Sequence, residues 1–140
     1  METDIVELLF NYKPDGFLLH RTTAEAWEKI QKEGLVPQLN LRENIYQKRV
    51  GSLPERITWL DREPAEVHLN RENHPVVIAV GHKQSYNMIE TIPGAEYITP
   101  EIIHPSEFLG VFDWRRRPEK DFLDWLGEIE EVARKRQMER

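Results

Sequence analysis

The chain has 140 residues, a formal net charge of −6 at pH 7, 39% hydrophobic and 31% charged residues, and no cysteine. This length fits a single domain, residues 1–140, and the composition is typical of a folded protein rather than a disordered one. The lack of cysteine excludes disulfides, thiol nucleophiles and cysteine-based zinc sites.

The negative net charge is unfavourable for binding bulk nucleic acid or an anionic membrane. Two stretches with several basic residues, 42–56 and 115–117, could still form a local basic patch. The N-terminus has no signal-peptide pattern, and the longest apolar run is residues 76–80, which is too short to span a bilayer. We therefore expect a soluble, cytoplasmic protein with no membrane partner.

The first elements lead to one strand and one helix. Residues 4–12 are apolar enough for a short helix or an edge strand, and residues 14–16 form a turn signal before an apolar strand at 17–19. Thr22 and Glu25 have the spacing of a capping box, which predicts a helix from about Thr23 to residue 33. Gly34 is placed to close this helix in a left-handed conformation, as in a Schellman motif with Leu35 against Ile30.

The middle of the chain alternates loops, strands and a short helix. Residues 38–56 are polar and predict a long loop, which in a compact domain is more often functional than idle. A strand at 57–60 precedes a short helix that has Pro64 in its first turn. Residues 76–82 predict a strand buried on both faces, whereas residues 86–90 give no clear pattern.

The last third predicts a turn at 92–94, a short strand at 96–99 and a final strand that includes Phe112. A helix follows at about 118–138, with acidic residues near its start and basic residues near its end. Its apolar residues recur with helical spacing, which indicates packing rather than catalysis: Phe122, Trp125, Leu126, Ile129 and Ala133.

Few residues suggest chemistry when they are taken singly. The sequence has no glycine-rich phosphate loop and no G-x-S-x-G motif, and four of its histidines lack metal-binding spacing, so we expect no metal site: His68, His74, His82 and His104. His20 stands at the end of a strand and just before a helix N-terminus, where backbone N–H groups favour an anion. The alternative is a buried histidine that bonds a backbone carbonyl.

Four segments in fixed order resemble the ADP-ribosyltransferases of the His-Tyr-Glu type, which include the poly(ADP-ribose) polymerases and diphtheria-like toxins. The first is the Leu-Leu-His-Arg-Thr run at 18–22 with the Lys-Glu-Gly-Leu end of the next helix. The second is Ile-Thr-Trp-Leu-Asp at 57–61 with Glu-Pro-Ala-Glu-Val at 63–67. The third is the strand at 76–80, and the fourth joins residues 95–99 to residues 102–109. The resemblance covers about residues 17–112.

This resemblance implies an α/β (α+β) fold in which two split, mainly antiparallel sheets enclose an NAD⁺ cleft between flanking helices. It implies NAD-dependent mono-ADP-ribosyl transfer to an unidentified acceptor, either protein or nucleic acid. By position, His20 would bond the adenosine ribose, with Arg21 and Thr22 also at the nucleotide. Trp59 would stack on nicotinamide where the family usually has tyrosine, and Glu96 would hold the 2′-hydroxyl of the nicotinamide ribose.

The chemistry of these residue types suits those roles. A carboxylate stabilises the oxocarbenium-like centre that forms when nicotinamide leaves, and indole is the best aromatic partner for a cationic ring. The family commonly has glycine where Arg21 stands, although some branches carry His-x-Thr. Two alternatives remain open from sequence: an RNA 2′-phosphotransferase, which would use Arg21, Arg42, Arg49 and Arg56, and a degenerate NAD- or ADP-ribose-binding module. Trp59 could also be a core residue and Glu96 a solvent-facing one.

Overall fold

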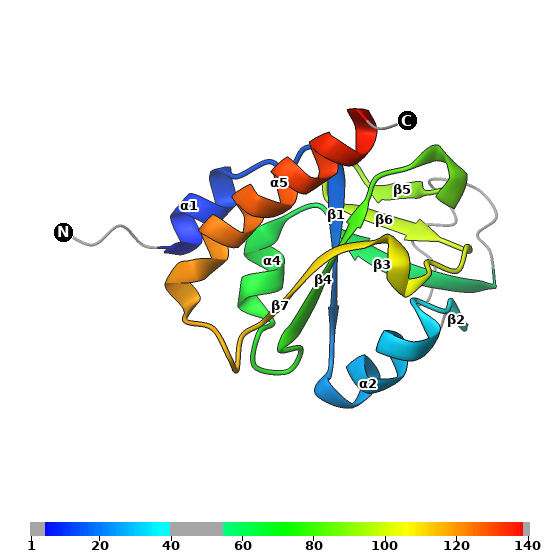
Figure 1. Cartoon of the computed structure of the whole chain (residues 1–140), viewed down its shortest axis with the longest axis horizontal. Coiled ribbons are helices and arrows are strands. Elements are labelled where there is room, and N and C mark those ends of the chain that lie inside the picture. Colours follow the sequence, from blue (N-terminus) through cyan, green and yellow to red (C-terminus); the bar gives the residue numbers. More distant parts are fainter. Residues whose placement is uncertain (1–4, 40–54, 139–140) are drawn as a thin grey trace.

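The computed structural model describes residues 5–39 and 55–138, which form one antiparallel sheet with helices on both faces (Figure 1). The strands are β1 (Phe17–Thr22), β2 (Gln38–Leu39), β3 (Arg56–Asp61), β4 (Val76–Gly81), β5 (Ile89–Ile92), β6 (Glu96–Thr99) and β7 (Phe108–Asp113). Their order is β5-β6-β3-β1-β4-β7, with β2 paired to β3. The predicted mixed α/β class is therefore confirmed, and the seven strands form a single connected sheet.

The helices are α1 (Ile5–Asn11), α2 (Ala24–Glu33), α4 (Pro64–Leu69) and α5 (Phe122–Met138), and short 3₁₀ turns lie at Gln84–Tyr86, Pro105–Glu107 and Glu119–Asp121. Most of the loop predicted at 38–56 lies outside the described residues, and its two ends form β2 and the start of β3. Within the described ranges, no helix is long and apolar enough to cross a membrane.

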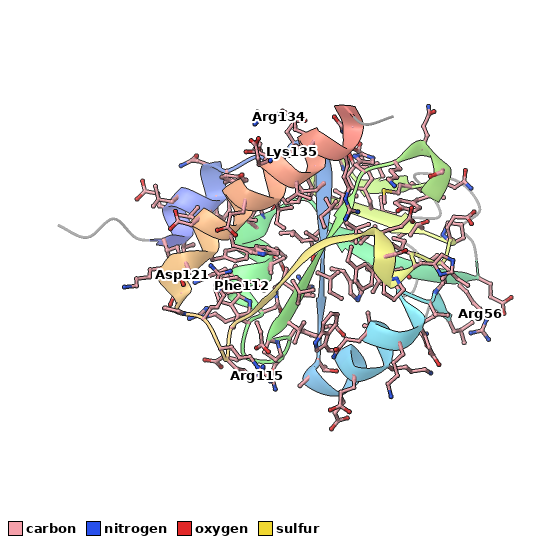
Figure 2. The ribbon with its side chains drawn as sticks, viewed as in Figure 1. Arg56, Phe112, Arg115, Asp121, Arg134 and Lys135 are labelled. Atoms are coloured by element: carbon pink, nitrogen blue, oxygen red, sulfur yellow. The ribbon has the colours of Figure 1, made fainter. Side chains whose placement is uncertain are left out.

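The first core lies between the sheet and helices α1, α4 and α5, and Figure 1 shows α5 running obliquely past α4. The apolar stripe predicted for the last helix is confirmed, because all five of its residues are buried. Phe112 of β7, labelled in Figure 2, lies with its ring 5.1 Å from that of Phe122 and 5.5 Å from that of Trp125. Such offset aromatic contacts add to the burial of apolar area that stabilises this face.

The second core lies on the opposite face, where Trp27 and Ile30 of α2 pack against it. Its buried members include Leu18, Leu35 and Tyr97. Side chains alternate along a strand, so β1 sends Phe17 and Leu19 to the first core and Leu18 to the second. β1 and β4 thus sit between two apolar layers, as the apolar run at 76–82 predicted.

Helix α2 begins one residue later than the capping box predicted. Oγ1 of Thr23 accepts the backbone N–H of Ala26 at 3.1 Å, so Thr23 is the N-cap and the predicted Thr22–Glu25 box is wrong. Thr22 cannot cap because it is the last residue of β1, is buried, and pairs with Val76 of β4. The next threonine is the first that can turn its hydroxyl to the helix start.

The end of α2 depends on Gly34. Its φ of 84° is positive, as predicted, but its ψ of −171° is extended, so the chain does not close in a Schellman motif. Leu35 instead forms an antiparallel bridge with Ile103, whose carbonyl oxygen accepts the Leu35 N–H at 2.8 Å. A β-carbon at residue 34 would lie 2.3 Å from that same carbonyl oxygen, so both conformation and space require glycine.

We expect Gly34→Ala to lower the free energy of unfolding by more than the roughly 1–3 kcal/mol that an unfavourable φ alone costs. Gly94→Ala is the matched control, because Gly94 has a φ of +71° and no described atom within 4 Å of an added β-carbon. Urea denaturation of both variants measures the two losses. Equal losses would contradict the role given to the Leu35–Ile103 bridge.

Candidate functional site

The candidate site begins where β1 and β3 separate. Along the described lengths of both strands, they are paired only where Leu19 faces Asp61. β1 then continues with β4 as far as the pair Thr22–Val76, whereas β3 continues with β6 as far as Thr58–Thr99. The connected sheet therefore has two halves, β5-β6-β3 and β1-β4-β7, which meet at the Leu19–Asp61 pair and separate beyond it.

The His20 side chain crosses this opening. Its Nδ1 lies 2.8 Å from the backbone carbonyl oxygen of Trp59, beyond the point where backbone pairing ends. Because a carbonyl oxygen only accepts hydrogen bonds, Nδ1 carries the proton of this bond. The strand-end histidine is thus bonded to a backbone carbonyl, which was the structural alternative left open by the sequence.

The protonation of His20 follows from its surroundings. Burial lowers the pKa of the imidazole, the charges of Arg21 and His74 lower it further, and the bond to the Trp59 carbonyl acts in the opposite direction. The ring is therefore neutral at physiological pH, with Nδ1 as donor and Nε2 as acceptor. A neutral His20 can accept a hydrogen bond from a ligand hydroxyl.

A pocket of about 630 Å³ lies beside the opening, within the size range of small-molecule sites. β1 contributes His20 and Thr22, β3 contributes Trp59, and α2 and the segment after it supply the facing wall. Three residues that the family resemblance implicated are therefore brought together by two different strands.

Thr58 also lines this pocket, and sequence reasoning did not single it out. The residue is only 5% exposed, and its Oγ1 has no hydrogen-bond partner among the described residues. The only sequence feature that pointed to Thr58 was its position next to Trp59 in a predicted strand. Sequence alone could not show that this hydroxyl is buried at an opening of the sheet.

Arg21 lies elsewhere. Its Nη1 is 3.4 Å from Oδ2 of Asp61 and 3.8 Å from Oε1 of Glu66, so two carboxylates from β3 and α4 neutralise it. Alternation along β1 places Arg21 on the opposite face from His20. Arg21 is not among the described residues that line the pocket.

Glu96 lies across β3 from β1, at the start of β6 and opposite Asp61. The described lining of the pocket does not include it, and its strand is two strand spacings, about 10 Å, from β1. The hydroxyl of Thr91 donates to Oε1 of Glu96 at 2.9 Å. Thr91 is fully buried at a bulge where the β5–β6 register shifts between Glu90 and Ile92, and the bulge directs its hydroxyl to this carboxylate.

No protein-family model matches the chain, and no curated protein or solved structure matches it either. Within residues 5–39 and 55–138, no group of three or more histidines and carboxylates is arranged to hold a metal ion.

The histidines make stability depend on pH. Burial is the largest cause that lowers the pKa of His20 and His74 below the ordinary value of 6.5. The unfolded chain binds more protons than the folded one as the pH falls below 6.5, so the free energy of unfolding should decrease there, by at most about 1.4 kcal/mol per pH unit for each histidine. Above that pH this stabilisation is fully present.

Urea denaturation at several pH values between 5 and 7.5 measures this dependence. This range lies above the pKa values of Glu90 and Glu107, which are lowered from 4.5. His20→Gln should flatten the curve, with His104→Gln, at an exposed position before the 3₁₀ turn Pro105–Glu107, as the control for loss of one imidazole. A curve that His20→Gln leaves unchanged would contradict the neutral state of His20.

Proposed function

We propose that the chain is an NAD-dependent mono-ADP-ribosyltransferase that binds NAD⁺, its substrate, at the β1–β3 opening. The observation that carries this proposal is the 2.8 Å bond from Nδ1 of His20 to the carbonyl of Trp59. It joins two of the residues that the resemblance implies for NAD⁺ binding, and both line one pocket of about 630 Å³. A mixed α/β fold with a sheet that opens next to this pocket also agrees with the resemblance.

The chemistry follows from the state of each group. Nε2 of the neutral His20 accepts a hydrogen bond from a ribose hydroxyl, and the indole of Trp59 offers a flat face to the cationic nicotinamide ring. When the bond between nicotinamide and ribose breaks, its electron pair leaves with nicotinamide and the ribose becomes cationic. Glu96, oriented by Thr91, stabilises this charge until the acceptor attacks the ribose and releases its proton to solvent water.

The setting of Arg21 favours transfer of ADP-ribose over RNA 2′-phosphate transfer. A phosphate pocket needs free arginines, but Arg21 is held by Asp61 and Glu66. Figure 2 shows Arg56 far from Arg115, so these two do not share one basic surface. Arg42 and Arg49 lie outside the described residues.

We expect His20→Asn to weaken NAD⁺ binding about ten- to a hundredfold, the loss of one hydrogen bond worth about 1–3 kcal/mol. The asparagine amide can still donate to the Trp59 carbonyl but offers no acceptor at the position of Nε2. Isothermal titration calorimetry measures the affinity, and exposed His104→Asn is the control. NAD⁺ affinity unchanged in a folded His20→Asn protein would remove this site.

We expect Glu96→Gln to lower nicotinamide release by at least ~10²-fold while NAD⁺ affinity changes little, because the charge acts on the transition state. Glu90→Gln is the matched control, since Glu90 on the neighbouring strand also accepts a hydroxyl, that of Tyr97 at 2.7 Å. Nicotinamide is measured with and without cell lysate as a source of acceptor. A binding module would release none in any form, and equal turnover by wild type and Glu96→Gln would exclude the role of Glu96.

A further inference from the structure

The hydroxyl of Thr58 is a polar group buried in a mainly apolar pocket. The residue is 5% exposed, and its pocket neighbours Leu35 and Ile57 are buried and apolar. No described residue bonds its Oγ1. A buried polar group without a hydrogen-bond partner destabilises a folded protein. An unpartnered hydroxyl at a pocket is therefore a candidate for binding a ligand.

Thr99 shows how the same residue type is satisfied nearby. Thr58 and Thr99 face each other across β3 and β6, and both are buried. The hydroxyl of Thr99 donates to the carbonyl of Tyr86 and accepts the N–H of Glu101 at 3.1 Å. Thr99 therefore has a structural role in the free protein, whereas the described part of the chain gives Thr58 none.

We propose that the Thr58 hydroxyl is a ligand-binding group that acts with Nε2 of His20 to hold the hydroxyls of a ribonucleoside. Thr58 adjoins Trp59, the residue whose carbonyl His20 bonds across the opening. The pocket thus receives polar groups from both diverging strands, β1 and β3. This inference rests on the proposed function and adds a residue that selects the sugar.

The chemistry of the pair selects a sugar diol. Neutral His20 offers an acceptor and Thr58 offers both a donor and an acceptor, so together they match two neighbouring hydroxyls, one of which donates to the ring. Neither group carries a charge at neutral pH, so the pair has no preference for phosphate or carboxylate. The apolar walls formed by residues such as Leu35 and Ile57 suit the flat faces of a base.

Thr58→Val tests this because valine keeps the shape and removes only the hydroxyl. We expect the NAD⁺ dissociation constant to rise roughly three- to thirtyfold, as for loss of one neutral hydrogen bond, while the urea midpoint of the free protein stays the same or rises. Thr58→Ser should retain most of the affinity. Thr99→Val, the matched control, should lower the urea midpoint because it removes a hydroxyl that is already bonded.

Ligands that each lack one sugar hydroxyl complete the test. Adenosine and nicotinamide riboside are each compared by calorimetry with their 2′-deoxy and 3′-deoxy forms, on wild type and Thr58→Val. Removal of the hydroxyl that Thr58 contacts should weaken binding to wild type but add little to the loss already present in Thr58→Val. Equal losses in both proteins for every ligand pair would overturn the inference, as would absence of nucleoside and NAD⁺ binding by wild type.

The result also separates this inference from the proposed reaction. Nicotinamide release by wild type with no change of affinity in Thr58→Val would overturn the role of Thr58 and leave the reaction intact. Nucleoside binding that depends on Thr58, without nicotinamide release, would support the sugar site and count against the transferase.

Discussion

The candidate site of this protein depends on the point where β1 leaves β3. Backbone pairing between them occurs where Leu19 faces Asp61, and beyond it His20 bonds the Trp59 carbonyl through its ring. A side chain thus bonds a backbone group that the neighbouring strand no longer reaches. The same bond fixes which nitrogen of His20 carries the proton, and so decides that the ring presents an acceptor.

The opening is supported by what surrounds it. β1 stays paired with β4 along its full length, and β4 is buried at every residue between the two cores. β3 stays paired with β6, and α2 together with the residues after it forms the wall opposite β3. Gly34 ends α2 so that Leu35 can pair with Ile103, which ties this wall to the body of the protein. Each half is held by its own pairing, and the pocket lies where the halves meet.

The proposed reaction places different demands on the two sides of the opening. At the opening itself, His20 and Thr58 are neutral and the neighbouring walls are largely apolar, which suits a sugar and a base. On the other side of β3, Glu96 keeps its carboxylate in a position held by Thr91 at the β5–β6 bulge. Bulges recur beside active sites because they redirect one side chain without ending the strand pair. Arg21 forms ion pairs with Asp61 and Glu66, so it links β1 to β3 and α4 and does not line the described pocket.

The sequence by itself determined what short-range patterns encode. Apolar periodicity predicted α5 and its buried stripe, the β-branched run predicted β4, and Gly34 predicted a helix end with positive φ, because each depends on residues close in the chain. The order of motifs also indicated His20, Thr22 and Trp59, which the fold brings to one pocket. Only the tertiary structure decided that Thr23 and not Thr22 caps α2, that Leu35 bridges Ile103, and that Thr58 is buried without a described partner. These features arise from pairing between strands far apart in sequence, and such pairing fixes which face a side chain takes and which backbone groups are already satisfied.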